Sequence, residues 1–126
     1  MKTLDRPMPA TWWLERKPYF IYMVREATSI FVAAYVVVLL VMLHRFSQGP
    51  EAYAAFLEGL KSPGAIVFHV VALAFALFHT ITWFQATPKA VAVWKGEQRL
   101  PAPMLIIPNY VVWIIVSAIL AWLILK

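Results

Sequence analysis

The chain is 126 residues long, and 63% of these residues are hydrophobic while only 13% are charged. Soluble domains usually contain about 45–50% apolar and about 25% charged residues. A protein of this size exposes much of its chain at the surface, so such an apolar excess cannot be hidden in its interior. The composition therefore excludes a soluble enzyme, a disordered tail and a DNA-binding module, and it indicates that lipid surrounds most of the chain.

The charge and the cysteine content narrow the class further. The net charge of +5 fits basic residues placed beside membrane spans, so no nucleic-acid partner is expected. The chain contains no cysteine, which excludes a disulfide framework, a thiolate zinc site and an iron–sulfur cluster ligated by this chain. We expect no metal site.

Three charge-free stretches, at residues 27–43, 62–88 and 104–125, predict an all-α membrane protein with three transmembrane helices. A spanning helix needs about 20 mainly apolar residues. We predict spans near 22–44, 64–85 and 105–125, the first of which contains Arg25 and Glu26 near its start. Residues 1–21 then form a cytoplasmic and interfacial segment, and residues 22–126 form the transmembrane part.

Lysine and arginine in short loops predict the orientation, because cytoplasmic loops carry an excess of them. The first connection has only Arg45 and Lys61. The N-terminal segment and the second connection together carry Lys2, Arg6, Arg16, Lys17, Lys89, Lys95 and Arg99. We therefore place the N-terminus and the second connection in the cytoplasm.

Short interfacial helices are predicted in both connections. In the first, Pro50 follows Gly49 and can open a helix. In the second, Thr87-Pro88 resembles a helix start and Gly96 a stop, which predicts a helix ending around Trp94-Lys95. Pro108-Asn109 is expected to bend the third span or to delay its start.

Inserting an ionisable side chain at the centre of a span costs roughly 2.5–3.5 kcal/mol, so each such residue needs a structural or functional explanation. Glu26 lies about 6 Å from the start of the first predicted helix, and His79 about 9 Å from the end of the antiparallel second one. A carboxylate and an imidazole thus lie at similar depth. Helical spacing adds neighbours, and the candidate site consists of Arg25, Glu26, Ser29, His79, Thr82 and Trp83.

This set of side chains suits a quinone, whose polar head needs hydrogen-bonding groups just below the interface. Glu26 and His79 can accept the protons released by a quinol, and the Trp83 indole can donate to a carbonyl. Nothing in the chain accepts electrons, so the redox partner must lie on another chain.

Other interpretations of the same residues stay open. Arg25 and Glu26 can be an interfacial ion pair, and His79 can be a structural imidazole bonded one turn back along its helix. His69 and His79 are expected to point in different directions, and we favour a structural or partner-facing role for His69. A b-type cytochrome anchor, with His69 or His79 as axial ligand, is the main alternative. A proton-coupled transporter that uses Glu26 is another.

The chain also resembles the C subunit of fumarate reductase, the membrane anchor of the haem-free quinol:fumarate reductase. The resemblance is collinear from about Thr11 to the second connection. It is carried by TWW at 11–13, YMVREAT at 22–28, GPEA at 49–52, HTITWF at 79–84 and PKA at 88–90. Ile81 stands where the family pattern has a lysine.

The resemblance implies a multi-pass protein of the bacterial inner membrane, non-catalytic by itself. It would pair with a similar membrane anchor, the D subunit, and hold the iron–sulfur B subunit together with the flavoprotein A subunit on the cytoplasmic face. Menaquinol would be oxidised at Glu26, His79 and Trp83, with Arg25 and Ser29 adjacent. FAD and the iron–sulfur clusters would belong to the other subunits, and no haem is expected.

Overall fold

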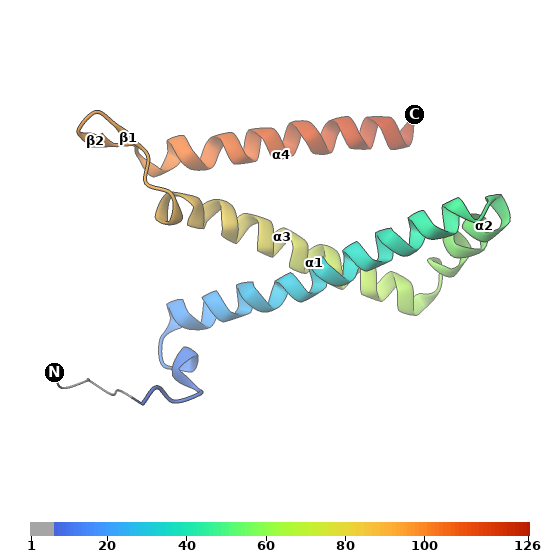
Figure 1. Ribbon diagram of the computed structural model, residues 1–126, viewed down its shortest axis with the longest axis horizontal. Coiled ribbons are helices and arrows are strands. Elements are labelled where there is room, and N and C mark those ends of the chain that lie inside the picture. Colours follow the sequence, from blue (N-terminus) through green and yellow to red (C-terminus); the bar gives the residue numbers. More distant parts are fainter. Residues whose placement is uncertain (1–6) are drawn as a thin grey trace. The chain divides into compact units, whose positions relative to one another are not determined.

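The computed structural model describes residues 7–126 and is all-α apart from one small hairpin (Figure 1). Its elements in chain order are η1 (Trp12–Leu14), α1 (Lys17–Ser47), α2 (Pro50–Gly59), α3 (Pro63–Ala90), β1 (Trp94–Lys95), β2 (Gln98–Arg99) and α4 (Ala102–Leu125). The chain divides into two compact units, Met1–His79 and Thr80–Lys126, whose boundary falls inside α3. Lys2 and Arg6, two of the basic residues used to predict orientation, lie outside the described residues.

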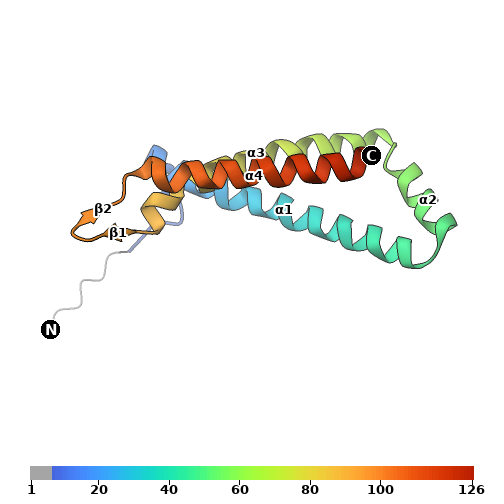
Figure 2. The same ribbon diagram turned by 90° about the horizontal axis from the view of Figure 1, so that it is seen from above.

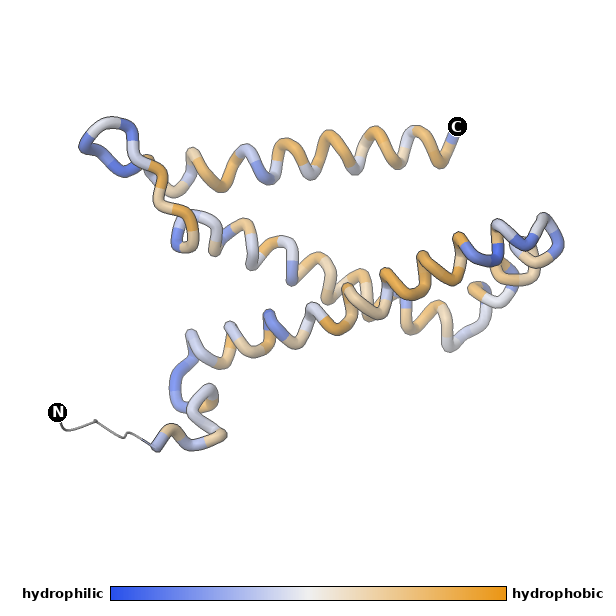
Figure 3. The backbone as a smooth tube through the Cα atoms, viewed as in Figure 1, coloured by the Kyte–Doolittle hydropathy of each residue, from blue (hydrophilic) through white to orange (hydrophobic). Residues whose placement is uncertain are grey.

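Helices α1, α3 and α4 are each long and apolar enough to cross a membrane, so the three predicted spans are confirmed. They contain 31, 28 and 24 residues. At about 1.5 Å per residue they measure about 46, 42 and 36 Å, against a hydrocarbon thickness of about 30 Å. Each helix therefore extends past the predicted span. Figure 3 shows apolar residues along the three helices and polar ones concentrated at the connections.

Local sequence signals account for both ends of α1. Pro18 lies in the first turn, where a missing N–H costs nothing. Arg45 lies in the last turn, where its positive charge interacts favourably with the helix dipole. Gly49 then turns the chain with φ 114° and ψ 173°, a backbone region that is essentially restricted to glycine.

The predicted helix in the first connection is confirmed as α2, which begins at Pro50. It follows α1 directly, and the Phe46 and Tyr53 rings contact each other edge to face at 5.4 Å between centroids. Figure 2 shows α2 as a bridge between the end of α1 and the beginning of α3. This short bridge makes α1 and the first part of α3 antiparallel neighbours.

The prediction of a helix in the second connection is wrong. Instead, α3 continues through Pro88 to Ala90, and the chain then forms an antiparallel hairpin in which Trp94 pairs with Arg99 and Lys95 with Gln98. Gly96, with φ 65°, opens the two-residue loop of this hairpin rather than ending a helix. The β-branched residues Val91 and Val93 favour the extended chain that leads into the hairpin.

Pro108 does not delay the third span, because α4 already begins at Ala102. The proline lies within the helix, and the next residue, Asn109, donates from Nδ2 to the Leu105 carbonyl at 3.0 Å. The same amide lies 3.5 Å from the Thr87 hydroxyl, which connects α4 to the end of α3 within the second unit. Here the aromatic ring of Phe84 also contacts Tyr110 and Trp113.

Very few side chains of residues 7–126 are buried within the chain. Within residues 7–126 only Thr28 and Ala72 are buried, and large apolar side chains are exposed along all three long helices. In water such a surface would not be stable as a monomer, whereas lipid or neighbouring apolar helices can cover it. The two buried residues lie on α1 and α3 and mark where these helices pack.

The conformation of Gly49 predicts that Gly49→Ala destabilises the protein by about 1–3 kcal/mol, because alanine is strained in this backbone region. Thermal unfolding in detergent, followed by circular dichroism, measures the shift. Gly59→Ala is the matched control, because Gly59 is helical and has open space around its Cα. We expect the control to be neutral or slightly stabilising, and equal effects of the two substitutions would contradict the assignment of strain to Gly49.

Candidate functional site

One face of α1 packs on α3 in the first unit. Thr28, Phe31 and Tyr35 follow the i, i+3, i+7 spacing that places side chains on one side of a helix. In the opposite order along α3, they meet His79, Phe75 and His69. The Phe31 and Phe75 rings stack with centroids 4.3 Å apart. This stack lies between a Thr–His contact on one side and a Tyr–His contact on the other.

The contact between Thr28 and His79 is a polar link between the two helices. Thr28 Oγ1 lies 2.9 Å from His79 Nδ1, and the same hydroxyl donates to the Arg25 carbonyl within α1. Only 1% of Thr28 is exposed. His79 is therefore bonded across the helix pair through Nδ1, which the interpretation of a ring bonded one turn back along its own helix did not anticipate.

Thr28 itself was absent from the predicted site. A signal for it exists in the sequence, because Thr28 is three residues after Arg25 and is polar within an apolar span. A hydroxyl in a helix usually bonds a carbonyl of its own preceding turn, so threonine alone carries no functional meaning. Only the packing of α1 against α3 shows that His79 lies next to it.

Arg25 lies beside this contact. It is three residues from Thr28 on the same side of α1, and only 15% of its side chain is exposed. Its guanidinium carbon lies 4.9 Å from the centre of the Tyr22 ring. Its Nε also lies 3.7 Å from Glu26 Oε1, which is a long distance for an ion pair. The Arg25 side chain thus contacts Tyr22 and Glu26 on α1, while its own backbone carbonyl accepts from Thr28.

Glu26 lies at the level of His79 but on a different face. It is only two residues from Thr28, so the similar depth predicted for Glu26 and His79 agrees with the packing. Residues two apart on a helix point about 200° apart, which turns Glu26 away from the α3 contact. Its side chain is 44% exposed, and Ser29, which donates to the Glu26 carbonyl, is exposed as well.

Thr82 and Trp83 follow His79 along α3 and belong to the second unit. Trp83 comes one helical turn after His79, and 43% of it is exposed. Thr82 is half-buried. The Thr28 hydroxyl thus connects two of the six predicted site residues, through the backbone carbonyl of Arg25 and the imidazole of His79. Glu26 and Ser29 occupy the exposed flank of α1.

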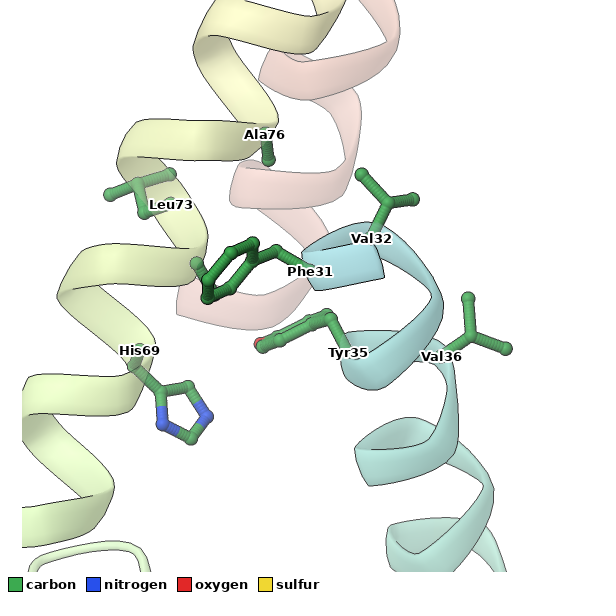
Figure 4. Close-up of a pocket in the computed structure, with 8 residues that line it drawn as sticks. Phe31, Val32, Tyr35, Val36, His69, Leu73 and Ala76 are labelled. Carbon is green, nitrogen blue, oxygen red and sulfur yellow. The ribbon is translucent and has the colours of Figure 1, made fainter. Parts of the chain in front are cut away.

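A groove of about 390 Å³ lies next to the Phe31–Phe75 stack (Figure 4). It is almost entirely apolar, and its lining comes from Phe31, Val32, Tyr35, Val36, His69, Ala72, Leu73 and Ala76. His69 donates from Nδ1 to the Ala65 carbonyl at 2.7 Å and meets the Tyr35 ring edge to face. The bond from His69 to its own helix fits a structural role.

His69 and His79 both contact α1, at positions about 80° apart around α3. They are ten residues apart on α3, which separates them by about 15 Å along the axis. That distance is too large for both to ligate one iron. Among residues 7–126, no group of three or more histidine or acidic side chains is placed to hold a metal ion.

Three long apolar helices with almost no interior of their own define a small multi-pass helical membrane protein that depends on its surroundings for burial. Its distinguishing feature is a polar cluster at one level of α1 and α3, formed by Arg25, Glu26, Thr28 and His79. The chain belongs to the family of fumarate reductase C subunits, whose model matches residues 1–125. It is thus a membrane anchor of a fumarate reductase complex.

The relatives of this chain cover most or all of its length. The fumarate reductase C subunit of Mycobacterium tuberculosis (strain H37Rv) is 36% identical over 126 residues, which is 100% of both chains. The C subunits of Enterobacter sp. (strain 638) and Klebsiella pneumoniae (strain 342) are each 37% identical over 105 residues, 82% of this chain and 80% of theirs. The resemblance seen in the motifs is confirmed, and it extends through α4.

The packing of α1 on α3 predicts that Phe31→Cys with Phe75→Cys can be joined by a short bifunctional thiol reagent. The native chain has no cysteine, so it offers no other thiol to the reagent. Mass spectrometry after trypsin cleavage measures the joined peptides. The control pair is Ile30→Cys with Phe75→Cys, because Ile30 is 69% exposed and lies about 100° around α1 from Phe31. Equal cross-linking of both pairs would contradict this packing.

Proposed function

We propose that this chain, together with the D subunit, forms the site at which menaquinol is oxidised beside the iron–sulfur B subunit. The observation that supports the proposal best is the Thr28–His79 contact, which joins the imidazole on α3 to the Arg25–Glu26 turn of α1. A cation, a carboxylate and an imidazole then lie at one level of two apolar helices, where each would otherwise be costly.

The chemistry of quinol oxidation assigns a role to each group. Two protons and two electrons leave the quinol, and His79 and Glu26 are the groups of this chain that can accept the protons. Arg25 offsets the negative charge of Glu26, and the Trp83 indole N–H can donate to a quinone oxygen. The electrons pass to the clusters of the iron–sulfur protein, because this chain has no cysteine to ligate a cluster.

The exposure of the remaining side chains supports a site that is shared with another chain. Glu26 and Ser29 lie on the flank of α1 that does not face the α3 contact, and Trp83 is also substantially exposed. In a single chain surrounded by lipid, the 44% exposed Glu26 carboxylate would be costly. The helices of the D subunit are the proposed cover, and they close the menaquinol pocket on this side.

We further propose that the N-terminus and the hairpin between α3 and α4 face the cytoplasm, where the iron–sulfur protein and the flavoprotein dock. The hairpin carries Lys95 and Arg99 on its two strands, and Trp94 is 61% exposed. Basic residues favour the cytoplasmic side. In this arrangement the chain anchors the complex in the inner membrane, while the fumarate chemistry takes place at the FAD of the flavoprotein.

The proposed orientation predicts that Glu58→Cys and Glu97→Cys differ in their reaction with a membrane-impermeant thiol reagent. In intact cells from which the outer membrane barrier has been removed, Glu58→Cys on α2 should react and Glu97→Cys in the hairpin should not. Both should react after the cells are broken. Both glutamates are exposed, so accessibility within the chain does not explain a difference. The reverse pattern of labelling would contradict the orientation.

The proposed site predicts that Glu26→Gln and His79→Asn each lower menaquinol-driven fumarate reduction by at least about tenfold, since positioned proton transfer contributes about 10²–10⁴-fold. Trp83→Leu should lower it too, because it removes the indole N–H that donates to the quinone. Fumarate reduction by a soluble artificial electron donor should stay near normal, because that route bypasses the membrane site. Steady-state assays of the purified complex with both donors measure the difference.

Glu51→Gln is the matched control for Glu26→Gln, because it removes the same charge from the exposed first turn of α2. We expect it to leave both activities unchanged. If the three site variants lose both activities together, the residues serve assembly rather than quinol oxidation. If they retain menaquinol-driven turnover, the proposed site is wrong.

A further inference from the structure

We infer that Thr28 is a positioning residue that fixes the tautomer and the orientation of His79. The inference rests on the proposed function, because it concerns how His79 is prepared to accept a proton at the menaquinol site. Thr28 is the most deeply buried polar residue in the described part of the chain. Its hydroxyl links α1 to α3 through a hydrogen bond with the imidazole.

The direction of the hydrogen bonds follows from the number of protons available. A hydroxyl has one proton to donate and two lone pairs to accept with. The Arg25 carbonyl carries no proton, so the contact between it and Thr28 requires Thr28 to donate. The hydroxyl proton is then committed to α1. The contact between Thr28 Oγ1 and His79 Nδ1 at 2.9 Å therefore requires the imidazole to donate from Nδ1–H.

This arrangement determines which nitrogen of His79 can act as a base. A neutral imidazole carries one proton, so a ring with Nδ1–H has its lone pair on Nε2. The proton that leaves the quinol is therefore accepted at Nε2. When Nε2 takes this proton, Nδ1–H can keep its bond to Thr28, so the ring need not turn during proton transfer.

The Thr28 hydroxyl has a hydrogen-bond partner even without His79. Its hydroxyl already donates within α1, which is how threonine usually satisfies itself in an apolar helix. The second contact gives the imidazole N–H a buried acceptor on the opposite helix. The β-branched side chain also has few rotamers, so the acceptor is held rigidly.

His69 provides an internal comparison. Its Nδ1 donates to the Ala65 carbonyl, one turn back on the same helix, so this bond is independent of the neighbouring helix. The bond from His79 Nδ1 to Thr28 crosses to the opposite helix, and its geometry depends on how α1 packs against α3. The Phe31–Phe75 stack, one turn away, holds that packing in place.

The test compares Thr28→Val with Thr28→Ser in the complete complex of all four proteins. Valine keeps the branched shape but offers no acceptor to Nδ1–H, whereas serine keeps the hydroxyl. At metal sites, loss of a group that orients a liganding histidine typically costs about 10–100-fold, and we apply the same range to His79. We expect Thr28→Val to lower the menaquinol-driven kcat by about that factor with a smaller change in KM, and Thr28→Ser to retain most activity. Turnover with the artificial donor should be unchanged in both.

A double substitution separates a role through His79 from an independent one. If Thr28 acts through His79, adding Thr28→Val to His79→Asn should cause no further loss of menaquinol-driven turnover. An equal fold loss in both backgrounds would overturn the inference, and so would full activity of Thr28→Val. A loss that Thr28→Ser does not rescue would also overturn it, because it would indicate a packing effect alone.

The tautomer can be measured without any turnover. In the complex with ¹⁵N-labelled histidine, the His79 resonances are those that disappear in His79→Asn, and they should show a neutral ring protonated at Nδ1. A ring protonated at Nε2 would overturn the inference while leaving the menaquinol site in place. Retained menaquinol-driven turnover in His79→Asn, by contrast, would refute the proposed site itself.

Discussion

The structure depends on the requirement that polar groups in a lipid environment find their partners within the protein. Thr28 and His79 meet this requirement together. The Thr28 hydroxyl donates a hydrogen bond to the Arg25 carbonyl within α1 and accepts one from the His79 imidazole on α3. This contact and the adjacent Phe31–Phe75 stack connect two helices that otherwise bury little. The polar cluster is therefore both a packing element and the centre of the proposed site.

The same requirement explains why so much of the chain is exposed. A membrane anchor has no need for an interior of its own, because lipid and neighbouring proteins complete its burial. Arg25 is packed against its own helix, whereas Glu26, one residue later, lies on an exposed flank. In the proposed complex, one side of α1 thus orients the imidazole, and the other side presents a carboxylate to the D subunit.

Much of the fold could be predicted from the sequence, because membrane spans are defined by length and apolarity alone. The three spans and the helix at Pro50 followed from such local signals. The helix expected after Thr87 did not form, because Pro88 is tolerated inside α3 and Gly96 suits a hairpin loop as well as a helix end. Glycine and proline mark boundaries, but they leave the type of boundary open.

The sequence by itself determined the class of protein, the level at which Arg25, Glu26 and His79 lie, and the family, because composition, rise per residue and motifs are properties of the chain. Only the tertiary structure decided which side chains meet. Helical periodicity assigns residues to faces, but the rotation of one helix against another is set by packing. That rotation placed Thr28, rather than Glu26, against His79.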